Sequence, residues 1–171
     1  MKGDKKEAVS MSVFKDRSRT DKIILFFATW FFSGLIPFAP GTWGSLMALP
    51  FAAAAYNFGH IYSCLSLLII FLFSIPVSSR ASKILKKEDP SAVVIDEVAG
   101  IFVTLFLIPV SWTSIAAGFV LFRVFDIIKP FPAGLIDKKI KGGAGIVLDD
   151  IMAGVYANVC LRIILIVIAR F

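Results

Sequence analysis

The chain has 171 residues, of which 58% are apolar and only 18% are charged, and its net charge is +6. Soluble domains average roughly 45–50% apolar and about 25% charged residues, and the mean hydropathy of +0.86 lies well above zero. This composition excludes a disordered chain, a disulfide scaffold and an ordinary soluble enzyme. It predicts an integral membrane protein.

Charged residues are confined to blocks that separate long apolar segments. Residues 23–79 are 57 positions without a charge, and residues 98–122 are another 25. A helix that crosses a bilayer needs about 20 apolar residues, so the first gap holds two or three membrane segments and the second holds one span or a tight hairpin. The basic residues flank these apolar runs, which favours a membrane surface over a nucleic acid as the partner.

The first half of the chain alternates between polar and apolar segments. Residues 1–22 are expected to form an exposed tail, with an amphipathic surface helix near residues 9–14. Residues 23–36 are apolar but too few to cross a bilayer alone. Residues 37–45 hold two prolines and two glycines, which predict either a turn outside the bilayer or a re-entrant functional loop. Two apolar membrane segments follow, at 46–58 and 61–77.

The second half is expected to contain four helices, over residues 90–108, 115–128, 133–140 and 146–171. Asp89 and Pro90 supply a cap and a first-position proline for the first of them. Lys129 and Pro130 end the second. Glycines from Gly142 onward end the third.

The distribution of Lys and Arg predicts which segments share one side of the membrane. Blocks 1–22, 80–97 and 123–150 carry seven, four and five basic residues, and we expect all three to face the cytoplasm. Residues 23–45 are then re-entrant or partly embedded, and the last helix ends outside. The predicted fold is an all-α, multi-pass integral membrane protein with short or re-entrant helices and a charged site at the cytoplasmic face. It comprises a tail, 1–22, and one membrane-embedded domain, 23–171.

Six acidic residues adjoin the apolar helices, where a charge is costly and normally marks a polar interior or a functional site: Asp96, Glu97, Asp126, Asp137, Asp149 and Asp150. Two adjacent acidic pairs and a further carboxylate predict a site for Mg²⁺, which prefers oxygen ligands. The competing interpretation is a set of interfacial charges that pair with nearby lysines. The expected catalytic residues and metal ligands are the same five: Asp96, Glu97, Asp126, Asp149 and Asp150.

Basic residues close to these acids fit a phosphate group. Arg123, Asp126 and Lys129 recur at intervals of three and so line one helix face, and a guanidinium binds phosphate oxygens with two parallel hydrogen bonds. Glycine-rich backbone before a helix can also present amides to an anion. The expected phosphate-binding residues are Arg123, Lys129, Lys141, Thr42 and Ser45.

Four motifs, in this order and spacing, resemble the phosphatidylglycerophosphatase A family: GLIPFAPGTWGS (34–45), IDEVAG (95–100), FRVFDIIKPFP (122–132) and KGGAGIVLDDIMAG (141–154). The resemblance covers about residues 23–160. It implies an all-helical, Mg²⁺-dependent enzyme of the bacterial inner membrane that removes the terminal phosphate of phosphatidylglycerophosphate. The resemblance also implies that the functional acidic and basic positions of the family correspond to Asp96, Glu97, Arg123, Asp126, Lys129, Asp137, Asp149 and Asp150. Many members carry histidine where this chain has Lys141, and a lysine there favours phosphate binding over proton transfer.

Two other functions compete with a lipid phosphatase. A small transporter or ion-path subunit would spread its acids through the depth of the bilayer, whereas these acids crowd at helix ends. A transferase that joins two lipid alcohols through a phosphodiester is disfavoured because its D-G-x2-A-R core is absent from the sequence. A single histidine excludes a two-histidine phosphatase, and the DxDx(T/V) motif is absent. Metal-assisted hydrolysis remains, with either water or an aspartate as the nucleophile.

Overall fold

The computed structural model describes residues 11–15 and 17–170, and this part of the chain is helical without β-strands. Its α-helices are α1 (Arg19–Ala28), α2 (Pro40–Asn57), α3 (His60–Leu85), α4 (Ile95–Leu105), α5 (Trp112–Ile128), α6 (Ala133–Lys139) and α7 (Gly143–Ile168). Short 3-10 helices occupy Met11–Phe14 and Ser33–Leu35. The all-α prediction is confirmed. Residues 1–10 of the predicted tail, including the start of its expected surface helix, lie outside the described residues.

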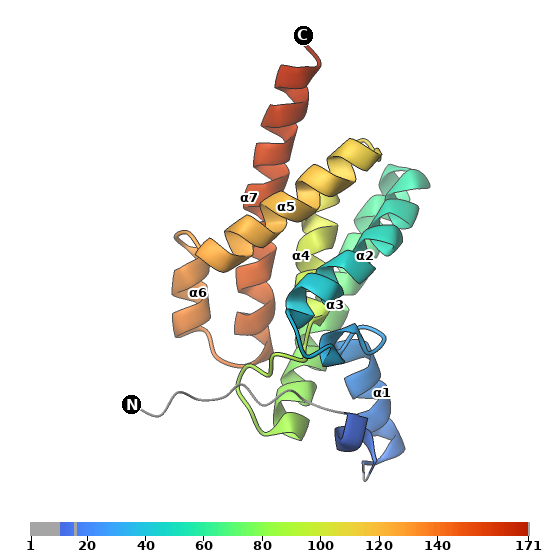
Figure 1. The fold of residues 1–171 in the computed structure, drawn as a ribbon, viewed down its shortest axis with the longest axis vertical. Coiled ribbons are helices and arrows are strands. Elements are labelled where there is room, and N and C mark those ends of the chain that lie inside the picture. The colour runs from blue at the N-terminus through green and yellow to red at the C-terminus, as the bar shows by residue number, and fades with distance from the viewer. Residues whose placement is uncertain (1–10, 16, 171) are drawn as a thin grey trace.

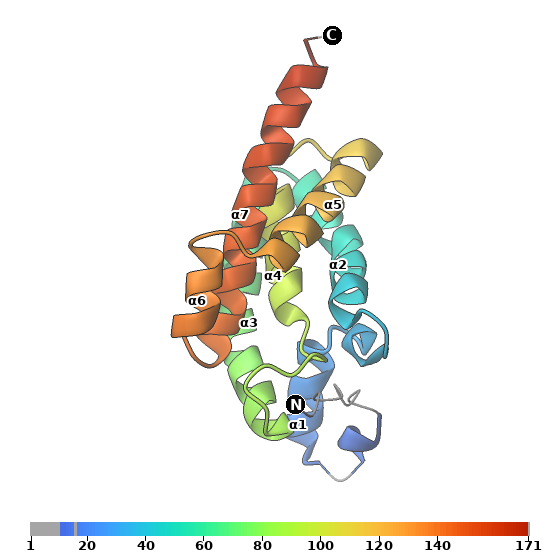
Figure 2. The same cartoon turned by 60° about the vertical axis from the view of Figure 1, so that its left-hand side comes forward.

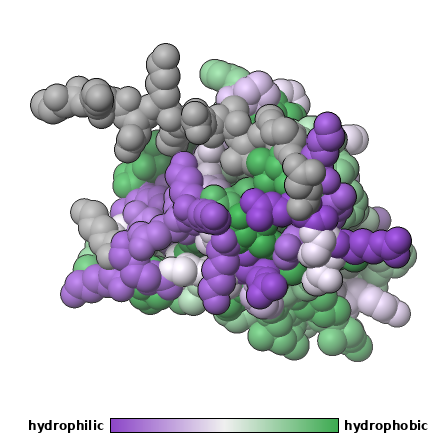
Figure 3. Space-filling model, turned by 90° about the horizontal axis from the view of Figure 1, so that it is seen from below, coloured by the Kyte–Doolittle hydropathy of each residue, from purple (hydrophilic) through white to green (hydrophobic). Residues whose placement is uncertain are grey.

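The helices form an elongated bundle with one polar end. α1, the connection from α3 to α4, and α6 all lie in the half of the molecule opposite the C-terminus (Figures 1 and 2). Seen from below, hydrophilic side chains spread across much of this end, with hydrophobic ones between them and along its edges (Figure 3). The charged blocks 80–97 and 123–150 therefore share one half of the molecule, as their composition led us to expect.

Two helices, α3 and α7, are long and apolar enough to cross a membrane, judged by length and composition. Each has 26 residues, and only 28% and 22% of their most apolar windows are buried in the protein. Large apolar side chains point outward along both, such as Leu68 and Ile69 on α3 and Ile163 on α7. The central helix of a soluble protein would bury such residues, so this surface favours contact with lipid.

α4 is the central helix, and nine of its 11 residues are buried. Its backbone touches that of α7, because a Cβ atom at Gly154 would lie 2.5 Å from the carbonyl oxygen of Gly100. A Cβ atom at Gly100 would lie 2.9 Å from the carbonyl oxygen of Asp150. Small residues permit such close helix crossings. The crossing brings the acidic first turn of α4 next to the acidic turn of α7.

The expected loop over residues 40–45 is wrong, because α2 begins at Pro40 and includes all of them. Proline is favoured at the first helical position, where its missing N–H would have had no partner. Position 44 of this helix requires glycine, because Val94 occupies the space that a larger side chain would need. A Cβ atom at Gly44 would lie 2.6 Å from the Cβ atom of that valine.

Two other helix boundaries in the structure also differ from the predicted ones. α4 begins at Ile95 and not near Pro90, because the N–H of Val94 donates to the carbonyl oxygen of Ala28 at 2.8 Å. This hydrogen bond ties the connection to α1 and keeps it out of the helix. α7 begins at Gly143, three residues before the expected start, after Gly142 with a φ of 77°. The predictions for α5 and α6 agree with the structure to within a few residues.

Candidate active site

A pocket of about 480 Å³ lies where the first turns of α2, α4 and α7 meet the last turn of α5. We call it the acidic pocket. The structure brings together in its lining nine of the charged residues that the sequence singled out: Asp96, Glu97, Arg123, Asp126, Lys129, Asp137, Lys141, Asp149 and Asp150. These residues come from segments up to 54 positions apart, and the crossing of α4 and α7 is what joins them.

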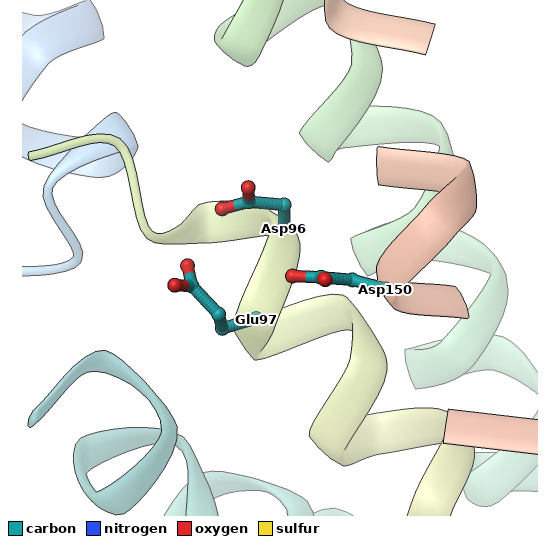
Figure 4. Close-up of side chains that lie close together, drawn as sticks. All are labelled: Asp96, Glu97 and Asp150. Atoms are coloured by element: carbon teal, nitrogen blue, oxygen red, sulfur yellow. The ribbon is translucent and has the colours of Figure 1, made fainter. Parts of the chain in front are cut away.

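Three of the carboxylates form a compact group. Asp96 and Glu97 lie on the first turn of α4, and Asp150 points toward them from α7 (Figure 4). One carboxylate oxygen from each lies within 4.8 Å of the other two. Asp96 Oδ1 and Glu97 Oε2 are buried and have no hydrogen-bond partner within residues 11–15 and 17–170. Ionised groups this close repel one another unless a cation lies between them, and an all-oxygen donor set fits Mg²⁺.

The other two expected metal ligands contact cationic side chains of the protein. Arg123 Nη1 lies 2.6 Å from Asp126 Oδ2, three residues further along α5. Lys129 follows the last turn of α5 and forms ion pairs with Asp149 and, at 3.0 Å, with Asp137. Asp126 and Asp149 therefore form the ion pairs that the competing interpretation describes, whereas Asp96, Glu97 and Asp150 form none of the ion pairs found in the described part of the chain. The binding of a cation by these acids stays a prediction.

Lys129 is held in its charged form by these neighbours. Partial burial alone would lower the pKa of its ammonium group, but the hydrogen bonds and charges of Asp149 and Asp137 outweigh burial and raise it. Its backbone has a φ of 46°, in the left-handed region that ends α5. Lys129 thus serves as a fixed positive charge on the wall of the acidic pocket.

Gly41 is a site residue that the sequence did not identify. A Cβ atom there would lie 3.1 Å from Glu97 Cδ and 3.2 Å from Arg123 Nη1. Glycine therefore lets the first turn of α2 lie against both an acidic and a basic side chain of the pocket. The signal was the Pro40–Gly41 dipeptide, which we interpreted as a loop and not as the start of a closely packed helix.

Thr42 and Ser45 were expected to bind phosphate, but the structure does not bring them to this site. In the part of the chain that the structure describes, neither of them lines the acidic pocket. Ser45 is fully buried, and its hydroxyl donates a hydrogen bond to the carbonyl oxygen of Gly41 at 2.7 Å.

The mouth of the acidic pocket is formed by residues that lie between helices. Lys141 Nζ lies 3.3 Å from Glu88 Oε2, and these two side chains are 70% and 81% exposed. Glu88 belongs to the connection between α3 and α4, and it was not among the expected site residues. This exposed pair links two connections across the pocket entrance, where a ligand would displace it at little cost.

Comparison with known proteins gives the chain its family. The family model described as Phosphatidylglycerophosphatase A matches residues 26–165. A protein of that name from Escherichia coli is 39% identical over 130 residues, which are 75% of this chain and 75% of the relative. Its namesake from Haemophilus influenzae is 39% identical over 132 residues, which are 76% of this chain and 81% of the relative.

A relative from Bacteroides thetaiotaomicron carries the provisional name phosphatidylinositol-3-phosphatase. It is 38% identical over 157 residues, which are 84% of this chain and 91% of the relative. No solved structure matches the chain. The matched residues, 26–165, include all four sequence motifs, which lie between residues 34 and 154. The chain belongs to the phosphatidylglycerophosphatase A family.

Proposed function

We propose that this chain hydrolyses the terminal phosphomonoester of phosphatidylglycerophosphate to give phosphatidylglycerol and inorganic phosphate. Membership of the family supports this reaction. The observation that carries the proposal is the group of Asp96, Glu97 and Asp150, whose carboxylate oxygens lie within 4.8 Å of one another beside Arg123. A compact group of carboxylates next to a guanidinium fits a metal-assisted phosphatase, which must neutralise phosphate oxygens while water or a carboxylate attacks phosphorus.

In this proposal Asp96, Glu97 and Asp150 would hold Mg²⁺. The bound ion would neutralise phosphate charge and orient the reacting groups. The donor chemistry supports the assignment, because buried carboxylate oxygens without hydrogen-bond partners in the described chain are costly unless a cation compensates them. Gly41 leaves room for the Glu97 carboxylate to take up this position.

Arg123 binds the phosphate oxygens of the substrate. Its ion pair with Asp126 fixes the guanidinium on the α5 face that lines the pocket, and a planar fork then meets two oxygens at once. Lys129 contributes positive charge from the pocket wall, held by Asp137 and Asp149. Lys141 exchanges its partner at the mouth, Glu88, for the incoming phosphate.

We further propose that the chain crosses the bacterial inner membrane several times with the acidic pocket on the cytoplasmic side. The polar end and the apolar flanks of α3 and α7 support this placement, because a lipid phosphate lies at headgroup depth, beside the apolar core. An ion path is less suitable, since the acids gather near one end of the helices and do not follow their length.

The reaction is tested with purified protein in detergent micelles. Phosphate release is measured from phosphatidylglycerophosphate, from phosphatidylinositol 3-phosphate and from glycerol 3-phosphate, with Asp150→Asn as the inactive control. We expect the first lipid to have the highest kcat/KM. Release from the inositol lipid alone would assign the activity suggested by the name of the Bacteroides relative, and release from neither lipid would reject the proposal.

The orientation is tested by cysteine labelling in intact cells, starting from a variant in which Cys64 and Cys160 are replaced by alanine. Cysteine at Lys139, the last residue of α6, should resist an impermeant thiol reagent, whereas cysteine at Trp112, the first residue of α5 and 89% exposed, should react. α6 lies in the half of the molecule opposite the C-terminus, and α5 begins in the half that holds it (Figure 1). The reverse pattern would place the acidic pocket outside the cell.

A further inference from the structure

A second hollow of about 580 Å³ adjoins the acidic pocket, and we call it the lysine groove. The two share Lys87, Glu88, Lys141 and Gly142 in their linings. Beyond these, the groove is formed by the end of α3, with Lys83 in its last turn and Lys86 directly after it, and by the first turn of α7. Four lysines face one acidic residue, Glu88, in this lining, so the groove attracts anions.

The first turn of α7 adds hydrogen-bond donors to the groove. No side chain of the described residues caps this helix, and its first backbone hydrogen bond runs from the N–H of Ile146 to the carbonyl oxygen of Gly142. The preceding N–H groups have no partner within the helix, and they form the positive end of a 26-residue helix. A Cβ atom at Gly143 would lie 2.5 Å from the carbonyl oxygen of Ile75, so glycine lets this turn approach α3.

Ser82 provides an independent sign that the groove receives a ligand. Ser82 is one of the residues that line the groove, and it is 9% exposed. Its hydroxyl oxygen has no hydrogen-bond partner in the described part of the chain. A buried hydroxyl left unpaired costs free energy, and a ligand with acceptor oxygens would satisfy it.

We propose that the lysine groove binds the phosphodiester group of the lipid substrate. The inference rests on the proposed function, because phosphatidylglycerophosphate carries two phosphates that are joined by one glycerol. With its terminal phosphate beside Arg123, the diester phosphate lies one glycerol unit away, which fits two adjoining anion sites. Lys83, Lys86, Ser82 and the first turn of α7 then select a lipid with a second phosphate over one with a phosphomonoester alone.

The test separates the two sites by product inhibition, since each reaction product retains one of the two phosphates. The double variant Lys83→Gln/Lys86→Gln is compared with Lys22→Gln/Arg80→Gln, which removes the same charge from exposed positions on α1 and α3. For the groove variant we expect KM for phosphatidylglycerophosphate to rise on the order of tenfold, because two charge-assisted contacts are lost. The inhibition constant of phosphatidylglycerol should rise equally, while kcat and the inhibition constant of inorganic phosphate stay within about threefold.

Lys83→Arg/Lys86→Arg, which keeps the charge, should restore most of the affinity and so exclude a folding defect. Unchanged KM and unchanged inhibition by phosphatidylglycerol would overturn the proposal and leave the lysines as caps of α3 that face lipid headgroups. An equal rise for inorganic phosphate would also overturn it, since the groove would then hold free phosphate.

The groove is also tested without catalysis. Short-chain phosphatidylglycerol is titrated calorimetrically into the wild-type chain and into both Gln double variants in detergent. If only the groove variant binds phosphatidylglycerol more weakly, the proposal for the groove is supported. This holds even where phosphatidylglycerophosphate is not hydrolysed, in which case the proposed function fails and the groove assignment stands. Equal affinities for all three proteins would overturn the groove assignment itself.

Discussion

The buried and the exposed parts of the acidic pocket differ in how firmly the fold holds their charged side chains. We call the group of Asp96, Glu97 and Asp150 the floor, and the pair of Lys141 and Glu88 the mouth. Asp96 and Asp150 on the floor are 7% and 4% exposed, on helices whose backbones meet at Gly100 and Gly154. The Lys141–Glu88 pair at the mouth is largely exposed and lies between helices. The acids of the floor are therefore fixed by backbone packing, whereas the charges of the mouth are exposed and held only by each other.

The largest effect is expected from Asp150→Asn on the floor. It should lower kcat on the order of 10³-fold, because an amide replaces a charged metal ligand. In chelator the variant should unfold at the same or a higher temperature than the wild type, since one of three repelling carboxylates is gone. Phosphate release and thermal unfolding measure both effects.

Asp89→Asn, an exposed acid in the same pocket lining, is the matched control and should keep most of the activity. A loss of activity as large in the control as in Asp150→Asn would remove the distinction between floor and mouth.

The next effect is expected from Gly154→Val, which inserts side-chain atoms between α4 and α7. The added atoms collide with the carbonyl oxygen of Gly100 and should destabilise the chain by about 1–3 kcal/mol. Activity should fall on the order of 10²-fold, because a small displacement of catalytic groups is costly. Val155→Leu, at the adjacent outward-facing position, is the control. A fully active Gly154→Val protein would show that the helix crossing does not position the carboxylates.

Arg123→Lys should also be costly, on the order of 10²-fold in kcat/KM, because an ammonium does not reproduce the two-oxygen contact of a guanidinium. Asp126→Asn should lose less, since Asp126 is paired with the guanidinium and the arginine itself is retained. Steady-state kinetics on phosphatidylglycerophosphate distinguish the two. The opposite ranking would make Asp126, and not Arg123, the residue in contact with the reacting groups.

The smallest effect is expected at the mouth. Lys141→Arg should keep kcat/KM within about threefold, because an exposed ion pair contributes little and the charge is retained. Lys141→Ala should raise KM more than it lowers kcat. A Lys141→Arg protein that binds substrate normally but has lost activity would instead make Lys141 a proton donor.

The sequence was sufficient to predict the fold class and nine of the charged residues that line the acidic pocket. Apolar runs and proline stops located α5, and the acids stood out because each adjoined an apolar helix. It was insufficient for the different positions of the two members of the second acidic pair, Asp149 and Asp150. Adjacent residues on a helix point about 100° apart, so the rotation of α7 decides that Asp150 joins the floor while Asp149 pairs with Lys129.

Tertiary contacts account for the other differences between the predictions and the structure. The start of α4 depends on the hydrogen bond from Val94 to Ala28, and the importance of Gly41 depends on the approach of α2 to Glu97. Both contacts join segments more than 50 positions apart, so no local pattern of residues could reveal them.

The central claim is that Asp96, Glu97 and Asp150 together hold a divalent cation required for phosphate release. The most direct measurement is titration of the purified chain with Mn²⁺, followed by electron paramagnetic resonance, for the wild type, Asp150→Asn and Lys141→Arg. We expect wild-type and Lys141→Arg proteins to bind Mn²⁺ equally, and Asp150→Asn to bind it at least about tenfold more weakly. Equal Mn²⁺ affinity in all three proteins, with full phosphate release in excess chelator, would contradict the account.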